Sequence, residues 1–394
     1  RAFEEIGGEV VQSTSFVLRN RIIKDTYGVY IRLINYKTAK LKAQKALEAV
    51  QNPSVPYRYL FYQRNYFFIP GCPIAFWVTK SFREIFQKSK KLSEYGKPVE
   101  GIKTGDNDRF LRYWFEIDIN NFSKVKENNE LPKWFPLAKG GPYRKWYGNS
   151  EFVINWFNDG KEILNYSKSA VPHRDLFFTP ALTWTYITSG KFSMRYLGDD
   201  FLYNNKGPAC YFSNKDYLFY VLGLTNTKVI DNILVFLAPT LDFKPGNIKN
   251  IPIIYEQKVA KTVNSLVKDN LELSKNDWDS FEISWDFSKH PLLKFPSNKI
   301  VSSFKHWKQY AESQFNQLKG NEEELNRIFI EVYGLRDELT PEVADEDVTI
   351  RKADLERDIK SFISYAVGCA FGRYSLDEEG LVYAGGEFDP NRYK

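Results

Sequence analysis

Residues 101–117, GIKTGDNDRFLRYWFEI, place a loop between two glycines directly ahead of an aromatic run that we predict to be a strand, residues 111–117. Gly101 and Gly105 permit a tight backbone turn. The loop carries side chains that can contact the phosphates or the base edges of DNA: Lys103, Thr104, Asn107 and Arg109. A β-turn with solvated charges is the alternative interpretation.

The sequence on either side of this stretch mixes strand-like and helical runs. Strands are predicted at residues 152–154, 184–187 and 192–197. Helices are predicted at residues 75–92 and 217–237, the second with a break near Asn226. Turns rich in Gly and Pro separate the runs. This mixture predicts an α+β fold class.

The first fifty residues change from a strand period to a helix period. Residues 9–18 and 27–34 alternate with a period of two, whereas residues 37–50 form a predicted helix that stops at Asn52-Pro53. Two strands and one helix cannot enclose a core, so we expect them to belong to a larger sheet. Four apolar side chains should then be partly exposed in this chain: Val11, Phe16, Val29 and Ile31.

From residue 300 onward the pattern is helical. Apolar residues at three-, four- or seven-residue steps run from Phe304 to Val332, with Gly320 as a candidate kink and Gly334 as the end. An acidic loop, residues 337–347, precedes a second predicted helix at residues 351–371. We expect the two helices to pack on each other or on the region before them.

The composition excludes several classes of protein. The chain has 394 residues, of which 43% are hydrophobic and 16% aromatic, so it is not intrinsically disordered. Its three cysteines lie far apart, which excludes a disulfide scaffold. Neither an uninterrupted membrane span nor a secretory signal is visible, and we expect a cytoplasmic protein without a membrane partner. Because residue 1 is Arg and the chain has one Met, we interpret it as a fragment.

The charge is unevenly distributed along the chain. Residues 1–150 carry 26 Lys and Arg against 14 Asp and Glu, whereas residues 301–394 carry 12 against 19. A basic half favours a polyanionic partner, because each Lys or Arg that contacts a phosphate releases counterions from nucleic acid. Many unrelated enzymes show a similar asymmetry.

Two further basic, aromatic loops resemble the first in chemistry. Residues 139–149 read KGGPYRKWYGN, and residues 183–196 form a predicted hairpin around Ser189-Gly190. The candidate DNA-binding residues in them are Arg144, Lys145, Trp146, Tyr147, Lys191 and Arg195. We predict that all three loops converge on one cleft, where Arg144 and Arg195 read bases and Lys103 and Lys145 contact phosphates. Aromatic side chains folded back onto the core, and a plain hairpin, are the alternatives.

The sequence lacks the common catalytic signatures. No phosphate-binding loop, no dinucleotide-binding glycine motif and no Gly-x-Ser-x-Gly occur. The three His and three Cys never come within metal-ligand spacing of one another. We therefore predict no catalytic, cofactor-binding or metal-binding residue.

Seven segments together resemble the PglX (BrxX) family, the adenine-specific DNA methyltransferases of type 1 BREX phage-defence systems. They are GEVVQSTSFVLRN (8–20), PGCPIAFWVT (70–79), GIKTGDNDRFLRYWFEI (101–117), KGGPYRKWYGN (139–149), ITSGKFSMRYL (187–197), ELTPEVADEDVTI (338–350) and SYAVGCAFGRYSLDE (364–378). The Gly-Ile-x-Thr-Gly-x-Asn element is also similar to the entry of target-recognition domains in Type IIG restriction-methylation enzymes and TaqI-like methyltransferases.

The resemblance implies three parts in the C-terminal region of such a protein. Residues 1–54 would be the last strands and helix of a class I methyltransferase sheet, residues 55–300 the DNA target-recognition domain and residues 301–394 a helical C-terminal region. It implies double-stranded DNA as a partner, an upstream methyltransferase domain in the same polypeptide, and other BREX proteins as candidate partners.

The family's catalytic motifs have no counterpart in this sequence. Such enzymes hold S-adenosyl-methionine on a glycine-rich loop and the flipped adenine on an Asn-Pro-Pro-Tyr or Asn-Pro-Pro-Phe motif, whereas the Asn-Pro pair here continues as Asn52-Pro53-Ser54. The resemblance therefore implies that S-adenosyl-methionine serves the full-length parent and that this fragment is inactive alone.

Three functions remain open from the sequence. The leading one is DNA sequence recognition for an N6-adenine methyltransferase. The second is a protein-interaction module that docks partner subunits of a defence complex through the acidic helical end. The third is a complete enzyme of an unrecognised kind, for which no site is visible. A salt-dependent DNA gel shift separates the first two.

Overall fold

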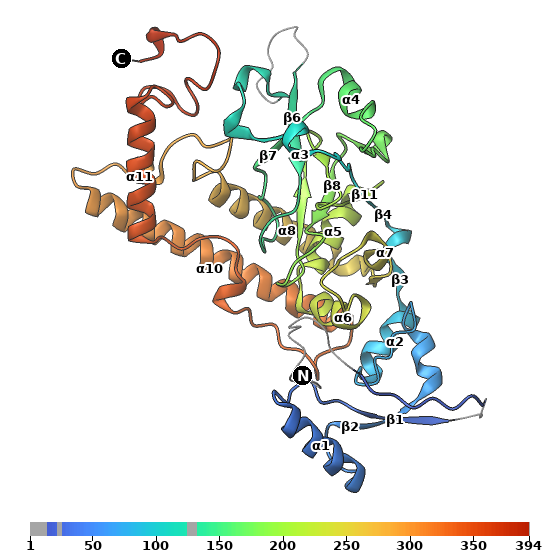
Figure 1. Cartoon of the computed structure of the whole chain (residues 1–394). Helices are drawn as coiled ribbons and strands as arrows, with labels where there is room; N and C mark the ends of the chain where they lie inside the picture. Colours follow the sequence, from blue (N-terminus) through green and yellow to red (C-terminus); the bar gives the residue numbers. More distant parts are fainter. Residues whose placement is uncertain (1–13, 22–25, 124–131, 394) are drawn as a thin grey trace. The chain divides into compact units, whose positions relative to one another are not determined.

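The computed structural model describes residues 14–21, 26–123 and 132–393 (Figure 1). The chain divides into two compact units, an N-terminal unit of residues 1–88 and a C-terminal unit of residues 89–394. Helices and small sheets occur together along the chain, which confirms the predicted α+β fold class. The functional boundaries expected after residues 54 and 300 differ from these compact units and stay predictions.

The N-terminal unit is built on a two-stranded antiparallel sheet. Tyr27 pairs with Tyr62, and the Tyr30 ring stacks on Phe76 with centroids 4.6 Å apart. The opposite sheet face leaves Val29 and Leu60 exposed. The elements are β1 (Tyr27–Ile31), α1 (Ala39–Gln51), β2 (Arg58–Tyr62), a 3₁₀ segment η1 (Gln63–Phe68) and α2 (Lys80–Lys88).

The predictions for this unit are confirmed in part. Phe16 and Val29 are exposed and Ile31 is half-buried, as expected, while Val11 lies outside the described residues. The strand predicted at residues 9–18 was wrong in its described part, because residues 14–20 pair with no other described strand. The helix predicted at residues 75–92 is shorter, since Thr79 accepts a hydrogen bond from the Phe82 amide where α2 begins.

Two four-stranded sheets form the centre of the C-terminal unit (Figure 1). The first, in the order β10-β6-β7-β5, consists of β5 (Leu111–Tyr113), β6 (Trp134–Ala138), β7 (Phe152–Asn155) and β10 (Leu202–Tyr203). The second, in the order β4-β11-β8-β9, consists of β4 (Gly96–Val99), β8 (Ala181–Trp184), β9 (Met194–Leu197) and β11 (Ala209–Phe212). All pairs in them are antiparallel except β10 with β6.

A large aromatic core joins residues from both sheets. Its fully buried members include Phe110, Trp114, Ile154 and Tyr203. The indole of Trp114 donates to the Ile283 carbonyl over 2.9 Å, which satisfies its polar atom in the core. Two further short strands, β3 (Lys90–Lys91) and β12 (Pro252–Ile253), pair outside these sheets.

Helices pack around the sheets of this unit. The short ones are α3 (Asn107–Phe110), α4 (Phe157–Leu164), α7 (Pro245–Ile248) and α9 (Pro291–Lys294). The longer ones are α5 (Lys215–Thr225), α6 (Lys228–Leu237), α8 (Gln257–Trp278), α10 (Ile300–Val332) and α11 (Leu355–Ala370). No single helix in the described ranges is long and apolar enough to cross a membrane; α5 and α6 reach that length and composition only together, bent by 79°.

The predicted elements of this unit were largely found, with shifted ends. The strand at residues 152–154, the helix break near Asn226 and the helix end at Gly334 are confirmed. The predicted strand at residues 184–187 was wrong, because β8 ends at Trp184, and residues 114–116 form a 3₁₀ turn rather than strand. Gly320 does not interrupt α10, and α8 is a helix for which no prediction was made.

Candidate nucleic-acid interface

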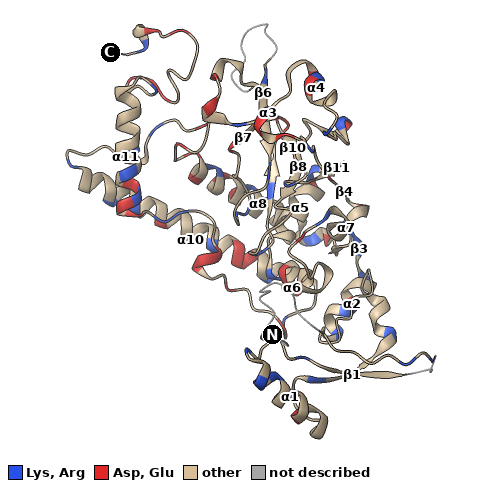
Figure 2. Cartoon of the chain, viewed as in Figure 1, with Lys and Arg blue, Asp and Glu red and all other residues tan. Residues whose placement is uncertain are grey.

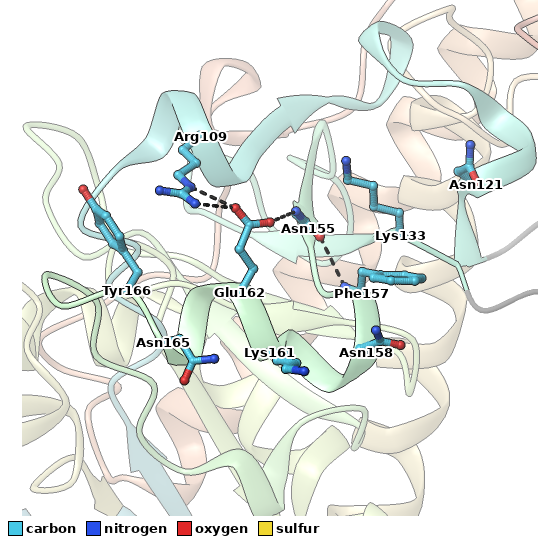
Figure 3. A pocket seen from close by; sticks show the side chains of 10 residues that line it. All are labelled: Arg109, Asn121, Lys133, Asn155, Phe157, Asn158, Lys161, Glu162, Asn165 and Tyr166. Atoms are coloured by element: carbon cyan, nitrogen blue, oxygen red, sulfur yellow. Dashed lines mark hydrogen bonds and ion pairs between the residues drawn. The ribbon is translucent and has the colours of Figure 1, made fainter.

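An open pocket of about 680 Å³ lies at one edge of the first sheet, where β5 and β6 begin and β7 ends (Figure 3). The antiparallel pairing brings these three strand ends together, and α3 and α4 supply the remaining wall. The lining combines cations, amides and aromatic rings: Arg109, Asn121, Lys133, Asn155, Phe157, Asn158, Lys161, Glu162, Asn165 and Tyr166. This is the chemistry that proteins use against nucleic acid.

Arg109 stands at one end of the pocket in a defined geometry. Asp106 caps α3 by accepting from the Arg109 amide over 3.0 Å. The guanidinium forms an ion pair with Glu162 at 2.8 Å and lies 5.3 Å from the centre of the Tyr166 ring. Both charged side chains are about half exposed, so the pair stays accessible to a competing anion such as a phosphate.

The backbone after β7 turns sharply and presents the first residues of α4. Asn158, Asp159 and Gly160 are all in the left-handed region, with φ of 49°, 56° and 73°. The Trp156 indole donates to the Asp159 carboxylate over 3.2 Å, and the Phe157 amide donates to the Asn155 side chain over 3.3 Å. The turn leaves the Phe157 ring 44% exposed within the pocket lining.

The pocket lining carries a net positive charge. Lys133 and Lys161 form no ion pair with any described residue, whereas Glu162 is shared by Arg109 and Asn155. Elsewhere in the unit, acidic residues occur along α10 and at the start of α11 (Figure 2).

The first predicted loop lies close to this pocket. Lys103 is exposed and weakly paired with Glu100 at 3.7 Å, and its backbone bridges to Ala170 just beyond α4. Thr104 is buried and donates to the exposed Asn107 side chain over 2.6 Å. Lys103, Asn107 and Arg109 are therefore available to a partner, and Thr104 shapes the loop from inside.

The second loop differs from the expectation, because its cations point into the protein. Arg144 forms an ion pair with Asp277 at 2.8 Å and donates to the Thr349 and Tyr147 carbonyls. Lys145 pairs with Glu322 at 2.8 Å, and the Trp146 indole donates to the same carboxylate over 2.7 Å. These side chains are buried and Tyr147 is half-buried, so the expected surface roles of Arg144, Lys145 and Trp146 do not fit this structure.

The third loop is split between surface and core. Lys191 is exposed but pairs with Asp347 at 2.6 Å. Arg195 is 1% exposed and donates to the Arg144 carbonyl over 3.1 Å, so it cannot reach a base edge in this structure. The backbones of residues 146 and 194–196 do pair, which joins the second and third loops, but inside the fold rather than along a DNA-facing cleft.

The electrostatics of the buried cations agree with these structural roles. Burial lowers the pKa of Arg195 to about 10, with a further contribution from Arg144. Burial also opposes the charge of Lys145, but the Glu322 carboxylate outweighs it and raises the pKa of that lysine. Lys145 is therefore a permanently charged member of an internal ion pair.

Comparisons with known proteins identify relatives over essentially the whole chain. The chain is 42% identical over 412 aligned residues to the adenine-specific methyltransferase PglX of Lacticaseibacillus casei (strain Zhang), covering 100% of this chain and 34% of the relative. It is 35% identical to the adenine-specific methyltransferase BrxX of Escherichia coli O9:H4 (strain HS), covering 98% of this chain and 32% of the relative. The chain matches part of the PglX and BrxX methyltransferases.

The similarity to PglX and BrxX is one of sequence, and the chain spans about one third of the length of these relatives. No protein-family model matches the chain. Among solved structures, the Type IIL restriction-modification enzyme MmeI in complex with DNA aligns with 71% of this chain and 36% of its own, at 12% identity and a TM-score of 0.37. That structural likeness is too low to establish a common fold.

Most residues that line the pocket of this PglX-like chain were not among the DNA-binding residues predicted from the sequence. Lys133, Phe157, Asn158 and Lys161 were not selected, although Asn158-Asp159-Gly160 is a recognisable left-handed turn signal. No group of three or more His, Cys, Asp or Glu in the described part of the chain is placed to hold a metal ion.

Proposed function

We propose that this chain is the DNA target-recognition part of a site-specific N6-adenine methyltransferase of the BREX type, in its C-terminal third. The observation that carries the proposal is the match of the whole chain to one third of PglX and BrxX, both named adenine-specific methyltransferases. The catalytic domain would lie elsewhere in the same polypeptide, and other proteins of the defence system are candidate partners.

Base flipping explains why recognition occupies a separate region. Adenine N6 is inside the duplex, and moving the base into a catalytic pocket costs a few kcal/mol. That cost is worth meeting only at the correct sequence, which a distinct domain can check before the base moves. Phosphate contacts supply most of the salt-dependent affinity, and each good base contact discriminates by about 1–3 kcal/mol.

The proposed DNA-contacting residues follow from exposure. Lys103, Arg109, Lys133 and Lys161 carry accessible charges on or beside the sheet-edge pocket. Asn107 is exposed on the same loop as Arg109. Arg144, Lys145 and Arg195 would act as positioning residues that hold the loops rather than touch DNA.

A salt titration of DNA binding tests the proposal. A plot of log K against log salt has a negative slope. Lys103→Ala and Lys161→Ala should each make this slope less steep by about one if the lysine contacts a phosphate. Lys308→Ala, an exposed lysine on the acidic helix α10, is the matched control and should leave the slope unchanged. Salt-independent binding, or equal behaviour of all three variants, would refute DNA recognition at this face.

A second candidate function has its own supporting observation. The C-terminal half of α11 and the residue that follows it expose three apolar side chains, Ile363, Val367 and Phe371. Contiguous exposed apolar surface is typical of protein–protein contact. If the chain shows no salt-dependent DNA binding, the protein-interaction module becomes the better proposal.

A further inference from the structure

The pocket at the sheet edge has two ends with different chemistry (Figure 3). At one end Arg109, Glu162 and Tyr166 already engage one another through an ion pair and a cation–π contact. At the other end Phe157 lies near Lys133 in the view of Figure 3, with Asn158 beneath it on α4. This second end presents an aromatic face and polar groups that the described residues leave unoccupied.

The Phe157 ring is held at the surface without an aromatic partner among the described residues, although 44% of the residue is exposed. A phenylalanine in water forgoes the free energy that burial would supply. The backbone that carries the ring is held from both sides, because the Asn155 side chain accepts from the Phe157 amide and the left-handed turn follows directly. The fold therefore keeps an exposed aromatic side chain at the pocket wall.

The turn behind Phe157 leaves little freedom to move. An added side-chain carbon at Gly160 would approach the Trp156 ring to 2.6 Å, and Trp156 itself is buried. Arg174 pairs with the Asp159 carboxylate and holds the turn from outside. Two of its residues, Asn158 and Asp159, are non-glycine residues in the left-handed region and carry backbone strain, which structures keep where the surroundings over-determine it.

Polar groups of two kinds share the pocket lining with the ring. Lys133 and Lys161 offer ammonium groups without an ion-pair partner in the described ranges, at a spacing set by β6 and α4. Asn158 is exposed, and Figure 3 shows its side-chain amide below the Phe157 ring in the same lining. Ammonium groups bind phosphates, and amides can donate to and accept from a base edge.

We propose that the Phe157 end of the pocket binds one unpaired, unstacked nucleotide of DNA. The base stacks on Phe157, the Asn158 amide meets its edge, and Lys133 and Lys161 bind the flanking phosphates. A base inside a duplex has both faces covered by its neighbours, so only a displaced nucleotide can use the ring. The cavity of about 680 Å³ lies within the range of small-ligand sites and can hold a nucleotide. This inference rests on the proposed function, and it specifies that the same site binds DNA in which one nucleotide is unpaired.

The test compares two DNA duplexes that differ by one unpaired nucleotide. The full 394-residue chain should bind the duplex with a single-nucleotide bulge more tightly than the fully paired one. Base–aromatic stacking corresponds to roughly 5- to 150-fold in affinity. Phe157→Ala should remove that preference, so that this variant binds both duplexes with equal affinity. Phe115→Ala, an exposed phenylalanine outside the pocket lining, is the matched control and should keep the preference.

The outcomes separate this inference from the proposed function. If the chain binds the paired duplex with normal salt dependence but shows no preference for the bulge, the nucleotide site is refuted and DNA recognition stands. A preference that survives Phe157→Ala also refutes the site. If neither duplex binds, DNA recognition itself fails. Thermal melting of both variants verifies that they are folded, which is expected because both side chains are exposed.

Discussion

At the scale of single residues, Glu322 determines whether the cation Lys145 in the second basic loop, residues 139–149, faces solvent or the core. Its carboxylate accepts from Lys145 over 2.8 Å and from the Trp146 indole over 2.7 Å, and all three residues are buried. A buried ammonium without its carboxylate is strongly destabilising, whereas a fully neutral replacement is tolerated. Glu322 therefore converts a cation that resembles a DNA contact into a structural one.

Glu322→Gln should lower the free energy of unfolding by about 3–5 kcal/mol, because Lys145 loses its counter-charge in the core. Urea denaturation measures the change. Glu324→Gln, which affects an exposed pair with Arg327 on the same helix, should alter the free energy of unfolding by less than about 1 kcal/mol. The double variant Lys145→Met with Glu322→Gln should regain much of the loss. Equal effects of Glu322→Gln and Glu324→Gln would contradict the role of the buried pair.

At the scale of elements, α10 shows how local signals and packing combine. The helix continues through Gly320, which is exposed and has no heavy atom within 4 Å of an added side-chain carbon. It ends at Val332, and Gly334 follows two residues later with a left-handed φ of 67°. The two glycines thus stand in equally open surroundings but in opposite backbone conformations.

Gly320→Ala should stabilise the chain by about 0.5–1 kcal/mol, since alanine loses less backbone entropy in a helix interior. Gly334→Ala should destabilise it by about 1 kcal/mol, because a side-chain carbon disfavours the left-handed conformation. Thermal unfolding of both variants measures the two changes. Shifts of the same sign would show that backbone conformation is not the determinant.

The residue that caps the N-terminus of the short helix α9, His290, is a titratable group with a defined pH effect. The buried His290 accepts from the Leu292 amide through Nδ1, and burial lowers its pKa from 6.5 to about 4. Between these values the unfolded chain binds a proton that the folded chain does not. The free energy of unfolding should therefore fall as the pH drops from 6.5 toward 4, by up to about 3 kcal/mol from this residue.

His290→Asn isolates that effect, because asparagine keeps an acceptor for the Leu292 amide but does not titrate. The melting temperature of the wild-type chain should decrease more between pH 7 and pH 4.5 than that of the variant. Parallel melting curves of the two proteins across this range would exclude His290 as a source of acid sensitivity.

At the scale of the whole molecule, polar contacts tie the C-terminal segment to the sheet region. Asp277 on α8 binds both Arg144 and Arg351, and Thr349 accepts from the Lys145 amide. The Trp307 indole on α10 donates to Asp358 on α11 over 2.8 Å. The acidic end of the C-terminal unit is therefore structural support for the basic loops rather than a separate appendage.

Removal of residues 335–394 should consequently damage folding more than DNA contact. The truncation leaves Asp277 with Arg144 alone and exposes the core around Trp307. Circular dichroism melting should show a marked loss of cooperativity relative to the full chain. A truncated chain that melts like the full one, yet loses salt-dependent DNA binding, would reverse this interpretation.

The full chain should neither bind S-adenosyl-methionine nor methylate DNA by itself. The sequence contains no glycine-rich cofactor loop after a strand and no Asn-Pro-Pro-Tyr motif, so no methyl-transfer step can be assigned to its residues. Calorimetry with the cofactor should show no saturable heat, and a methylation assay no product. Micromolar binding would place the cofactor site in this chain and contradict the proposal that the catalytic domain lies elsewhere in the polypeptide.

The sequence by itself determined the positions of strands, helices and helix breaks that depend on interactions between residues close together in the chain. The period-two run at residues 152–154, the break near Asn226 and the helical stripe after Phe304 all appear in the structure, because alternation and helix period are local properties. The sequence of α8 has the same helical spacing of apolar residues, with Ala260, Val263 and Val267 buried, so this helix was also predictable from the sequence.

Only the tertiary structure decided which cations face solvent. Lys103 and Lys145 both lie in glycine-rich, aromatic loops, and no local pattern distinguishes them. Lys145 is buried because Glu322, 177 positions away, folds against it, whereas Lys103 pairs with its half-exposed neighbour Glu100 and stays exposed. Burying a charge costs least where an opposite charge meets it, and for Lys145 chain topology brings that partner. The pocket arose in the same way, since antiparallel pairing brings together three strand ends that lie far apart in the sequence.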